Sequence, residues 1–395
     1  MARVLWASPV PPVRSGVSDY TMELLPALAA RGVGVRLLPP PDWRPPHGWE
    51  LPAGVSLAGP GENAPRRGEL AVWNMGNNPH HEWLLPLLER HRGVVVLHDL
   101  VLHHLLVETT VARGDLEAYR RAMAAEYGPA GEALADGRRW GFTAPRDPFL
   151  FPARRFVLEK ASAAVVHSSW AEARVREDMP GLPVYRVPMG VVDPRPLERD
   201  ALRLELGIGE DEIAVMHLGF LTPAKGLEAV LEGIAVARSR GVPARLVLVG
   251  EGDAGGAVSA AAGRLGLGDA VGWTGWVDTA RMRRLPAAAD LGVVIRRPSA
   301  GETSAAVLRF LACGTPVAVS ALPQFLEFPR EAAFRLTPGS EGAELARLLV
   351  EEGRARGTLA ARRPAVEAYW ARNHTLEVMA EAWVRALTAM EETAR

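Results

Sequence analysis

Lys225 stands out because this chain hardly uses lysine. Only Lys160 and Lys225 are lysines among its 45 basic residues, and the others are arginines. Lys225 lies in the segment 219–226, between an apolar run and an amphipathic stretch, and parallel sheets bind ligands at such strand-to-helix loops. An exposed lysine at a helix start is the ordinary alternative, but a compact ammonium also suits a phosphate. We therefore predict that Lys225, together with Gly219 at the start of the loop, binds an anionic group.

A second strand-to-helix loop runs from 296 to 304. Gly301 allows a close approach of the backbone, and Thr303 or Ser304 can cap a helix whose N-terminal amides would accept an anion. The carboxylate of Glu302 can accept two hydroxyl donors and so suits a sugar ring. An ordinary glutamate at a helix start explains Glu302 equally well. The loop thus predicts a diphosphate with a sugar beside it.

Polar side chains are concentrated in one part of the first half. Three of the five asparagines lie in 74–81, and six of the ten histidines lie between 80 and 104. Such clusters at strand ends are typical of polar ligand sites. His98 follows an apolar run and could orient an acceptor hydroxyl, although a buried, hydrogen-bonded histidine is an equally open interpretation. The predicted site is lined by Asn77, Asn78, His98 and Asp99.

A metal site in this region is the weaker interpretation. His98, Asp99, His103 and His104 are close in sequence. However, His98 and His103 are five residues apart, which fits one face of a helix poorly. We therefore expect no metal ion at this position.

The first loop, 11–20, lacks the G-x-G-x-x-G pattern of a dinucleotide site, which argues against an oxidoreductase. Ser15 and Gly16 could bring backbone amides towards a phosphate or an acceptor. They could also form nothing more than a turn and a helix cap.

The overall composition excludes several classes of protein. The 395 residues carry 45 basic and 46 acidic side chains, so we expect no nucleic-acid partner. The single cysteine, Cys313, excludes a disulfide framework and favours a cytoplasmic protein. No apolar run reaches the ~20 residues of a membrane-spanning helix, which leaves a peripheral membrane contact open.

Short β-branched runs alternate with amphipathic stretches, which is typical of an α/β protein with helices on both faces of a parallel sheet. Strands are expected at 4–7, 33–38, 70–74, 94–97, 163–167, 184–187, 213–218, 245–249, 291–295 and 316–320. Helices are expected at 226–240 and 303–312, and 105–160 is expected to be a helical insertion.

The chain length favours two domains. The stretch 188–196 holds three prolines and a glycine, and it is expected to be a linker. We therefore predict one domain at 1–190 and another at 191–363. The tail, about 364–395, contains Trp370 and Trp383 and is expected to return to the first domain.

These segments together resemble family 4 of the retaining glycosyltransferases, which have the GT-B architecture. In that architecture, two Rossmann-like, doubly wound parallel-sheet domains face each other across a cleft. The resemblance covers most of the chain. It rests on 11–20, 76–78, 97–99, 167–168, 219–226, 249–252, 272–275 and 302–317.

The resemblance implies transfer of a hexose-type sugar from a nucleotide-diphosphate donor to an acceptor hydroxyl, with no metal and no cofactor. The acceptor could be a glycan, a lipid-linked molecule or a small molecule. Lys225 would bind the diphosphate, Glu302 the sugar hydroxyls, and His98 would lie near the reacting carbon. The further residues implied on the donor side are Gly16, Gly219, Arg297, Gly301, Thr303, Ser304 and Arg309, and those on the acceptor side are Ser15, Asn77, Asn78 and Asp99.

Two positions differ from the family pattern. Phe220 stands where the family usually has an arginine, so a second cation for the diphosphate must come from Arg14, Arg296 or Arg297. The family also has a second glutamate eight residues after the first. Counting eight residues forward from Glu302 leads to Phe310. Counting back from the segment 313–316, which also matches the family, leads to Arg309. These differences leave two alternatives: a GT-B protein that binds a nucleotide sugar without turnover, or a GT-B sugar-nucleotide epimerase.

Overall fold

The computed structural model describes residues 2–59, 61–252 and 254–393. Its internal contacts divide the chain into two compact units. Unit 1 consists of Met1–Met189, Ala300–Thr303 and Leu376–Arg395, and unit 2 of Gly190–Ser299 and Ser304–Thr375. Each unit is built on one parallel sheet with helices, which confirms the predicted α/β class.

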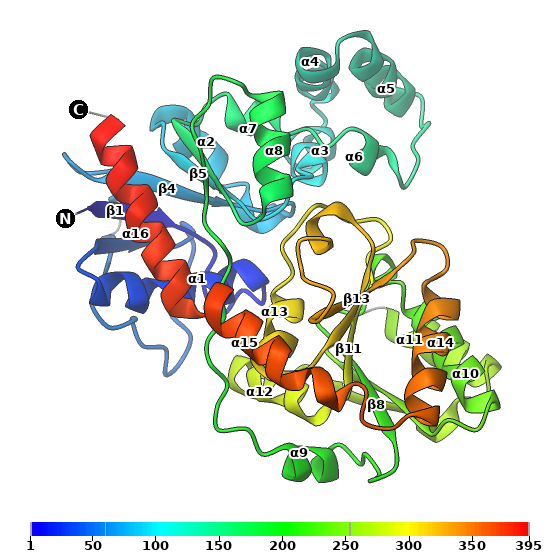
Figure 1. Ribbon diagram of the computed structural model, residues 1–395. Helices are drawn as coiled ribbons and strands as arrows, with labels where there is room; N and C mark the ends of the chain where they lie inside the picture. The colour runs from blue at the N-terminus through cyan, green and yellow to red at the C-terminus, as the bar shows by residue number, and fades with distance from the viewer. Residues whose placement is uncertain (1, 60, 253, 394–395) are drawn as a thin grey trace. The chain divides into compact units, whose positions relative to one another are not determined.

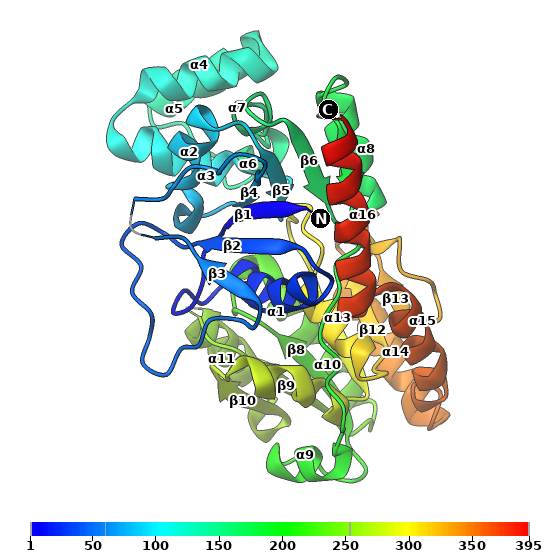
Figure 2. The same cartoon turned by 90° about the vertical axis from the view of Figure 1, so that its left-hand side faces the viewer.

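Unit 1 contains a seven-stranded parallel sheet of order β3-β2-β1-β4-β5-β6-β7, and Figure 2 shows its β1–β3 side with α1 nearby. The strands are β1 (Arg3–Ala7), β2 (Gly34–Leu38), β3 (Val55–Leu57), β4 (Leu70–Met75), β5 (Val94–Leu97), β6 (Ala163–Val166) and β7 (Val184–Arg186). The helices next to the sheet are α1 (Gly16–Ala30), α2 (Leu84–Arg90) and α8 (Ser169–Asp178). Every residue of β5 is buried, as expected for a central parallel strand covered on both faces.

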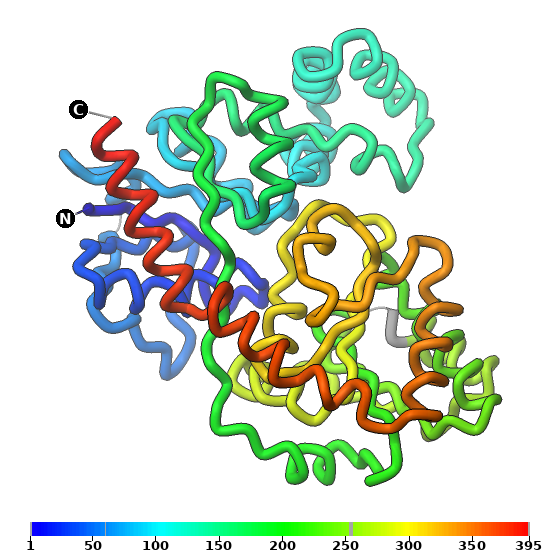
Figure 3. The backbone as a smooth tube through the Cα atoms, in the orientation of Figure 1, coloured from blue at the N-terminus to red at the C-terminus, as the bar shows by residue number. Residues whose placement is uncertain are grey.

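Between β5 and β6 the chain makes the helical excursion that the sequence predicts (Figure 3). Its helices are α3 (His103–Thr109), α4 (Leu116–Tyr127), α5 (Pro129–Arg139), α6 (Asp147–Leu150) and α7 (Arg155–Leu158). They enclose a small core of their own, made of Leu106, Tyr119, Met123, Ala135 and Ala153. We call residues 103–158 the helical insertion.

Unit 2 contains a six-stranded parallel sheet of order β10-β9-β8-β11-β12-β13. The strands are β8 (Ile213–Leu218), β9 (Ala244–Val249), β10 (Val271–Gly275), β11 (Leu291–Val294), β12 (Val317–Ser320) and β13 (Ala333–Leu336). The helices are α9 (Arg199–Glu205), α10 (Leu227–Ser239), α11 (Ala254–Arg264), α12 (Thr279–Arg284), α13 (Ala305–Ala312), α14 (Glu341–Arg354) and α15 (Arg363–Asn373). Both predicted helices of this half are present, as α10 and α13.

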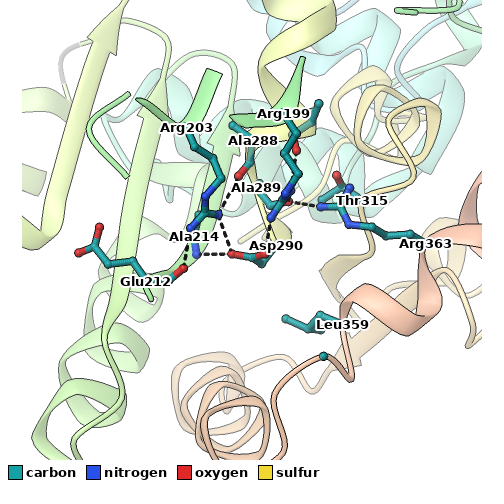
Figure 4. A network of polar contacts seen from close by, with 12 residues as sticks. Arg199, Arg203, Glu212, Ala214, Ala288, Ala289, Asp290, Thr315, Leu359 and Arg363 are labelled. Atoms are coloured by element: carbon teal, nitrogen blue, oxygen red, sulfur yellow. Dashed lines mark hydrogen bonds and ion pairs between the residues drawn. The ribbon is translucent and has the colours of Figure 1, made fainter. Parts of the chain in front are cut away.

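A polar network holds the N-terminal ends of two strands of unit 2 (Figure 4). The carboxylate of Asp290 binds Arg199 at 2.6 Å and Arg203 at 3.1 Å, and accepts the amide of Ala214 at 2.8 Å. Arg363, the first residue of α15, donates to the Ala289 carbonyl at 2.5 Å. The network therefore fastens α9 and α15 to the sheet at the end opposite to the Lys225 loop.

The C-terminal helix, α16 (Leu376–Thr393), belongs to unit 1, where it packs along α1 (Figure 1). Trp383 is fully buried, its indole N–H donates to the Tyr20 hydroxyl at 2.8 Å, and its ring lies 5.0 Å from the ring of Trp6. The predicted return of the C-terminal helix is thus confirmed for α16, whereas α15, which carries Trp370, belongs to unit 2. Among the described residues, no helix combines the length and the hydropathy of a membrane-spanning segment.

Candidate active site

Lys225 lies near the C-terminal end of β8, on a single 3-10 turn (Pro223–Lys225) that precedes α10. The segment after β11 lies against this turn, because the amide of Arg297 donates to the Ala224 carbonyl at 2.8 Å. The structure therefore brings together, within unit 2, the Lys225 loop and the arginine segment that the sequence singles out.

The loop after β9 supports the loop after β8 through backbone contacts. The amide of Gly219 donates to the Val249 carbonyl at 2.9 Å. Gly250 adopts a φ of 142°, and a Cβ added to it would lie 2.1 Å from the carbonyl oxygen of Gly219. Only glycine permits both this conformation and this approach, so Gly250 fixes the position of the loop that ends at Lys225.

Three basic side chains gather at this end of the sheet. His217, on β8, is buried, and burial together with the charges of Lys225 and Arg296 lowers its pKa to about 3. Arg296 is also buried and donates to the Ile295 carbonyl at 3.0 Å and to the Ser304 hydroxyl at 3.4 Å. His217 is therefore neutral, while Lys225 and Arg296 provide positive charge that favours an anion.

Arg297 is engaged by a carboxylate that the sequence did not point to. It forms a two-point ion pair with the buried Glu341, through Nε at 3.0 Å and through Nη2. The amide of Gly339 also donates to Glu341, at 2.7 Å. Burial acts to raise the pKa of Glu341, but these hydrogen bonds outweigh it and the pKa is lowered. Glu341 thus offsets the charge of Arg297, and Arg296 is the arginine that adds to the charge of Lys225.

The predicted capping role of Ser304 differs in the structure. Ser304 occupies the N-cap position of α13 but makes no side-chain capping bond, because its hydroxyl lies near Arg296. Further along α13, Arg309 is buried, with Nη1 3.0 Å from the sulfur of Met282. Phe310 packs over Gly292, where an added Cβ would lie 2.6 Å from its ring. Positions 309 and 310 therefore contribute to the packing of α13.

In unit 1, His98 follows β5 and is oriented by Asn74 at the end of β4. Its Nε2 lies 3.1 Å from Oδ1 of Asn74, whose Nδ2 donates to the Ala7 carbonyl at 3.0 Å. Because the amide nitrogen of Asn74 is used on Ala7, its oxygen faces the imidazole and Nε2 is assigned as the donor. This leaves Nδ1 of the neutral ring as its hydrogen-bond acceptor.

Aromatic rings surround His98. The ring of Tyr20 lies 4.9 Å away in an edge-on arrangement, and that of His167 lies 5.3 Å away. Burial, together with the neighbouring His167 and His81, lowers the pKa of His98 well below its usual value. His98 is therefore neutral at physiological pH and can exchange a hydrogen bond with a hydroxyl group.

The other polar residues predicted at this edge bind the protein backbone. Oδ1 of Asn77 accepts the amides of His104 at 3.0 Å and Leu105 at 3.2 Å, at the start of α3. The amide of Asn77 donates to Asp99 at 2.9 Å, and Oδ1 of Asn78 accepts the amide of His80 at 3.0 Å. These contacts fix the loops around His98.

At the start of α1, the hydroxyl of Ser15 accepts the amide of Ser18 at 3.1 Å, so Ser15 caps the helix. Gly16 is the first residue of α1, and an added Cβ there would meet no heavy atom within 4 Å. The approach to this helix terminus is therefore open on the side of Gly16.

The segment that carries Glu302 belongs to unit 1, where it contacts the residues that follow His98 in the chain. The amides of Leu100 and Val101 donate to the Ala300 carbonyl at 2.8 and 3.1 Å. Gly301 has a φ of 77°, and an added Cβ would lie 2.8 Å from Trp170 and 2.9 Å from Leu100. The close approach predicted for Gly301 is thus made to protein atoms. It holds the neighbouring Glu302 in the same unit as His98.

Sequence reasoning missed four residues that shape these sites: Asn74, Tyr20, His217 and Glu341. Asn74 lies in the asparagine cluster that the sequence shows, so its contact with His98 could have been proposed. The others carry no local signal, because their importance comes from contacts between distant segments. In the described ranges, no group of three or more His, Cys, Asp or Glu side chains is arranged to hold a metal ion.

Known proteins resemble this chain in sequence and in fold. Residues 212–351 match the family model described as glycosyl transferases group 1. Over 346 residues the chain is 26% identical to the D-inositol 3-phosphate glycosyltransferase of Segniliparus rotundus, a match that covers 79% of this chain and 70% of that one.

Two solved structures share the fold. Sucrose-phosphate synthase from Thermosynechococcus elongatus matches with a TM-score of 0.69 and 19% identity over 100% of both chains. Anabaena HepE in complex with UDP and glucose matches with a TM-score of 0.67 and 15% identity, covering 98% of this chain and 100% of that one. The chain thus has the GT-B fold of these structures, and its residues 212–351 carry a glycosyl transferases group 1 domain.

Proposed function

We propose that this glycosyltransferase is retaining and metal-independent, and that it moves a hexose from a nucleotide-diphosphate sugar to an acceptor hydroxyl. The observation that carries the proposal is the cationic end of the unit 2 sheet, where Lys225 and Arg296 lie near the neutral His217. Two fixed cations can neutralise a diphosphate without a metal ion. HepE, a structural neighbour, was solved with UDP-glucose, so UDP-glucose is the first donor to test.

In this proposal Lys225 and Arg296 bind the diphosphate, and Glu302 accepts hydrogen bonds from the sugar hydroxyls. Thr303 and Ser304 contribute backbone amides, and His98 lies beside the reacting carbon. The acceptor oxygen bonds to the anomeric carbon on the face from which the phosphate departs, and that phosphate takes the acceptor proton. The cations stabilise the charge that develops on the leaving group.

The first experiment is a thermal-shift screen with UDP-, GDP-, ADP- and dTDP-sugars, because a donor that binds the folded state raises the melting temperature. Nucleotide release is then measured with the donor that binds, with and without candidate acceptors and with and without EDTA. Proton NMR of the product gives the anomeric configuration. Loss of activity in EDTA, or an inverted product, would contradict the proposal.

The replaced family positions support a second candidate, a protein that binds a nucleotide sugar without turnover. Phe220 is 44% exposed where the family usually has an arginine, and Phe310 is fully buried in packing. This candidate predicts a thermal shift without nucleotide release for any acceptor. An epimerase would instead convert the donor sugar with no acceptor present, which the same NMR experiment detects.

A further inference from the structure

Three large apolar side chains are strongly exposed in one short stretch of the helical insertion. Trp140 and Phe142 are each 76% exposed, and Leu150 is 69% exposed. In the described part of the chain, four large apolar side chains exceed two-thirds exposure, and the fourth is Leu204 at 83%. Three of four within eleven residues is a cluster, whereas single exposed apolar residues such as Leu204 need no explanation.

The core of the helical insertion does not need these side chains. That core uses other aromatic residues nearby, because Phe151 and Phe156 pack against it while Trp140 and Phe142 do not. We call residues 140–150 the apolar loop. It runs from the end of α5 through α6, and these helices stand apart from the strands of the unit 1 sheet (Figure 1).

Hydrogen bonds hold the apolar loop in a defined conformation. At its start, the amide of Phe142 donates to the Gly137 carbonyl at 2.9 Å. At its other end, Asp147 accepts the amide of Ala144 at 2.7 Å and donates its own amide to the Ala144 carbonyl at 3.0 Å. A loop fixed at both ends presents its apolar side chains without needing to be ordered on binding, which favours association.

The exposed charges around the apolar loop are positive. From 136 to 150 the chain has three arginines, Arg138, Arg139 and Arg146, and two aspartates, Asp136 and Asp147. Arg139 and Arg146 are exposed, whereas both aspartates are half-buried. Arg139 contacts Glu117 at 3.0 Å, an exposed ion pair that water and salt weaken. Tryptophan and phenylalanine beside arginine is the combination that suits a bilayer interface, where rings enter the acyl boundary and cations meet anionic headgroups.

A second copy of the chain fits this surface less well. In a two-fold symmetric dimer through the apolar loop, the same arginines would face each other across the interface. The exposed parts of three side chains also supply at most about 550 Å², even at roughly 250 Å² for each whole side chain, whereas a stable dimer buries about 800 Å² per partner.

We propose that the apolar loop is a membrane-docking surface that inserts Trp140 and Phe142 into the headgroup region of an anionic bilayer. This inference rests on the exposure and charge of the loop and is independent of the donor and the reaction. It places unit 1 at a lipid surface by a contact that is peripheral and reversible.

The test is flotation of the full-length protein with vesicles of phosphatidylcholine and phosphatidylglycerol, compared with vesicles of phosphatidylcholine alone. The wild-type protein is expected to bind the anionic vesicles, and to bind neutral ones several-fold more weakly. The double variant Trp140→Ser/Phe142→Ser should lose binding by about tenfold or more. The matched control is Leu204→Ser, which removes an equally exposed apolar side chain from α9 in unit 2 and should bind as the wild type does.

Thermal unfolding and light scattering of each variant complete the test. The double variant is expected to unfold at the wild-type temperature, because neither side chain belongs to a core. Equal vesicle binding by the wild type and the double variant would overturn the proposal. So would a wild-type protein that ignores vesicles, or a wild-type dimer that the double variant converts to a monomer.

Discussion

Lys225 lies at the same end of the unit 2 sheet as His217 and Arg296, and in the proposed reaction its replacement lowers the positive charge available to the leaving diphosphate. We expect Lys225→Ala to lower kcat/KM about 100-fold or more, the loss typical when a preorganised charged contact is removed from a transition state. Lys160→Ala is the matched control, because Lys160 is the other lysine and forms only an exposed ion pair with Glu89 at 3.2 Å. Nucleotide release under donor-limiting conditions measures both. Equal activity of the two variants would show that Lys225 does not bind the donor.

Buried histidines make the free energy of unfolding depend on pH, and His81, His167 and His217 illustrate the effect. Burial lowers the pKa of His81 and His167 to about 4, and burial with Lys225 and Arg296 lowers that of His217 to about 3. The unfolded chain, with histidine pKa values near ~6.5, binds these protons first as the pH falls. The contribution of each buried histidine to the free energy of unfolding is therefore fully present above about pH 7. It decreases below that pH by up to about 1.4 kcal/mol per pH unit, until the pKa of the histidine in the folded state is reached.

Urea unfolding between pH 7.5 and 5 checks this dependence. His167→Gln should reduce the slope, because its amide can still donate to the Val187 carbonyl that His167 contacts at 2.9 Å but does not titrate. Replacing the exposed His47 with glutamine should leave the slope unchanged. A flat stability profile for the wild type would show that these histidines are not buried as described.

At the scale of elements, the packing of the loop after β9 against the loop after β8 predicts the effect of a single methyl group. Gly250→Ala should destabilise unit 2 by about 2 kcal/mol or more and weaken donor binding, because its Cβ must displace the carbonyl of Gly219. Gly263→Ala, in an exposed part of α11 with no heavy atom within 4 Å of the new Cβ, should stabilise by about 0.5–1 kcal/mol. Denaturant titration and donor titration of both variants distinguish strain from a general intolerance of alanine.

The contact between α1 and α16 predicts a coupling between two residues far apart in sequence. Tyr20→Phe leaves the indole N–H of Trp383 buried without its acceptor, which should destabilise unit 1 by about 1–3 kcal/mol. Adding Trp383→Phe removes that unsatisfied donor. The double variant should therefore be less destabilised than the sum of the single variants. Strict additivity would mean that the hydrogen bond does not contribute.

The elements differ in how well the sequence predicts them. All ten expected strands are present, because central parallel strands form continuous apolar runs such as β5. β3, β10 and β13 were missed. All three lie at sheet edges, where exposed or half-buried positions interrupt the buried run.

The site follows the same logic. The loops after two central strands could be located from composition alone, and Lys225 and His98 lie in these loops, after β8 and β5. The side chains that orient or offset them could not, since Glu341 contacts Arg297 from 44 residues away. Ser15, Asn77 and Asn78 are in the expected places but bind backbone amides, the role that short polar side chains most often have at helix starts.

At the scale of the whole molecule, the division into units predicts what a truncation does. A chain ending at Thr375 lacks α16 and uncovers Trp6 and Tyr20, so β1 and β4 should lose protection from hydrogen exchange. Strands β8 and β9, which belong to unit 2, should keep theirs. A chain ending at Met390 retains Trp383 and serves as the control. Unchanged protection of β1 in the shorter chain would show that unit 1 is stable without its last helix.

The hydrogen bond between Tyr20 and Trp383 spans 363 residues, and this separation has a consequence for the timing of synthesis. At about 5–20 residues per second, the second partner is made roughly 20–70 s after the first. During that interval the aromatic face of α1 has no α16 to cover it, while unit 2 is completed once Thr375 emerges. The newly made first half is therefore expected to bind chaperones on the ribosome, and the emergence of α16 to release it.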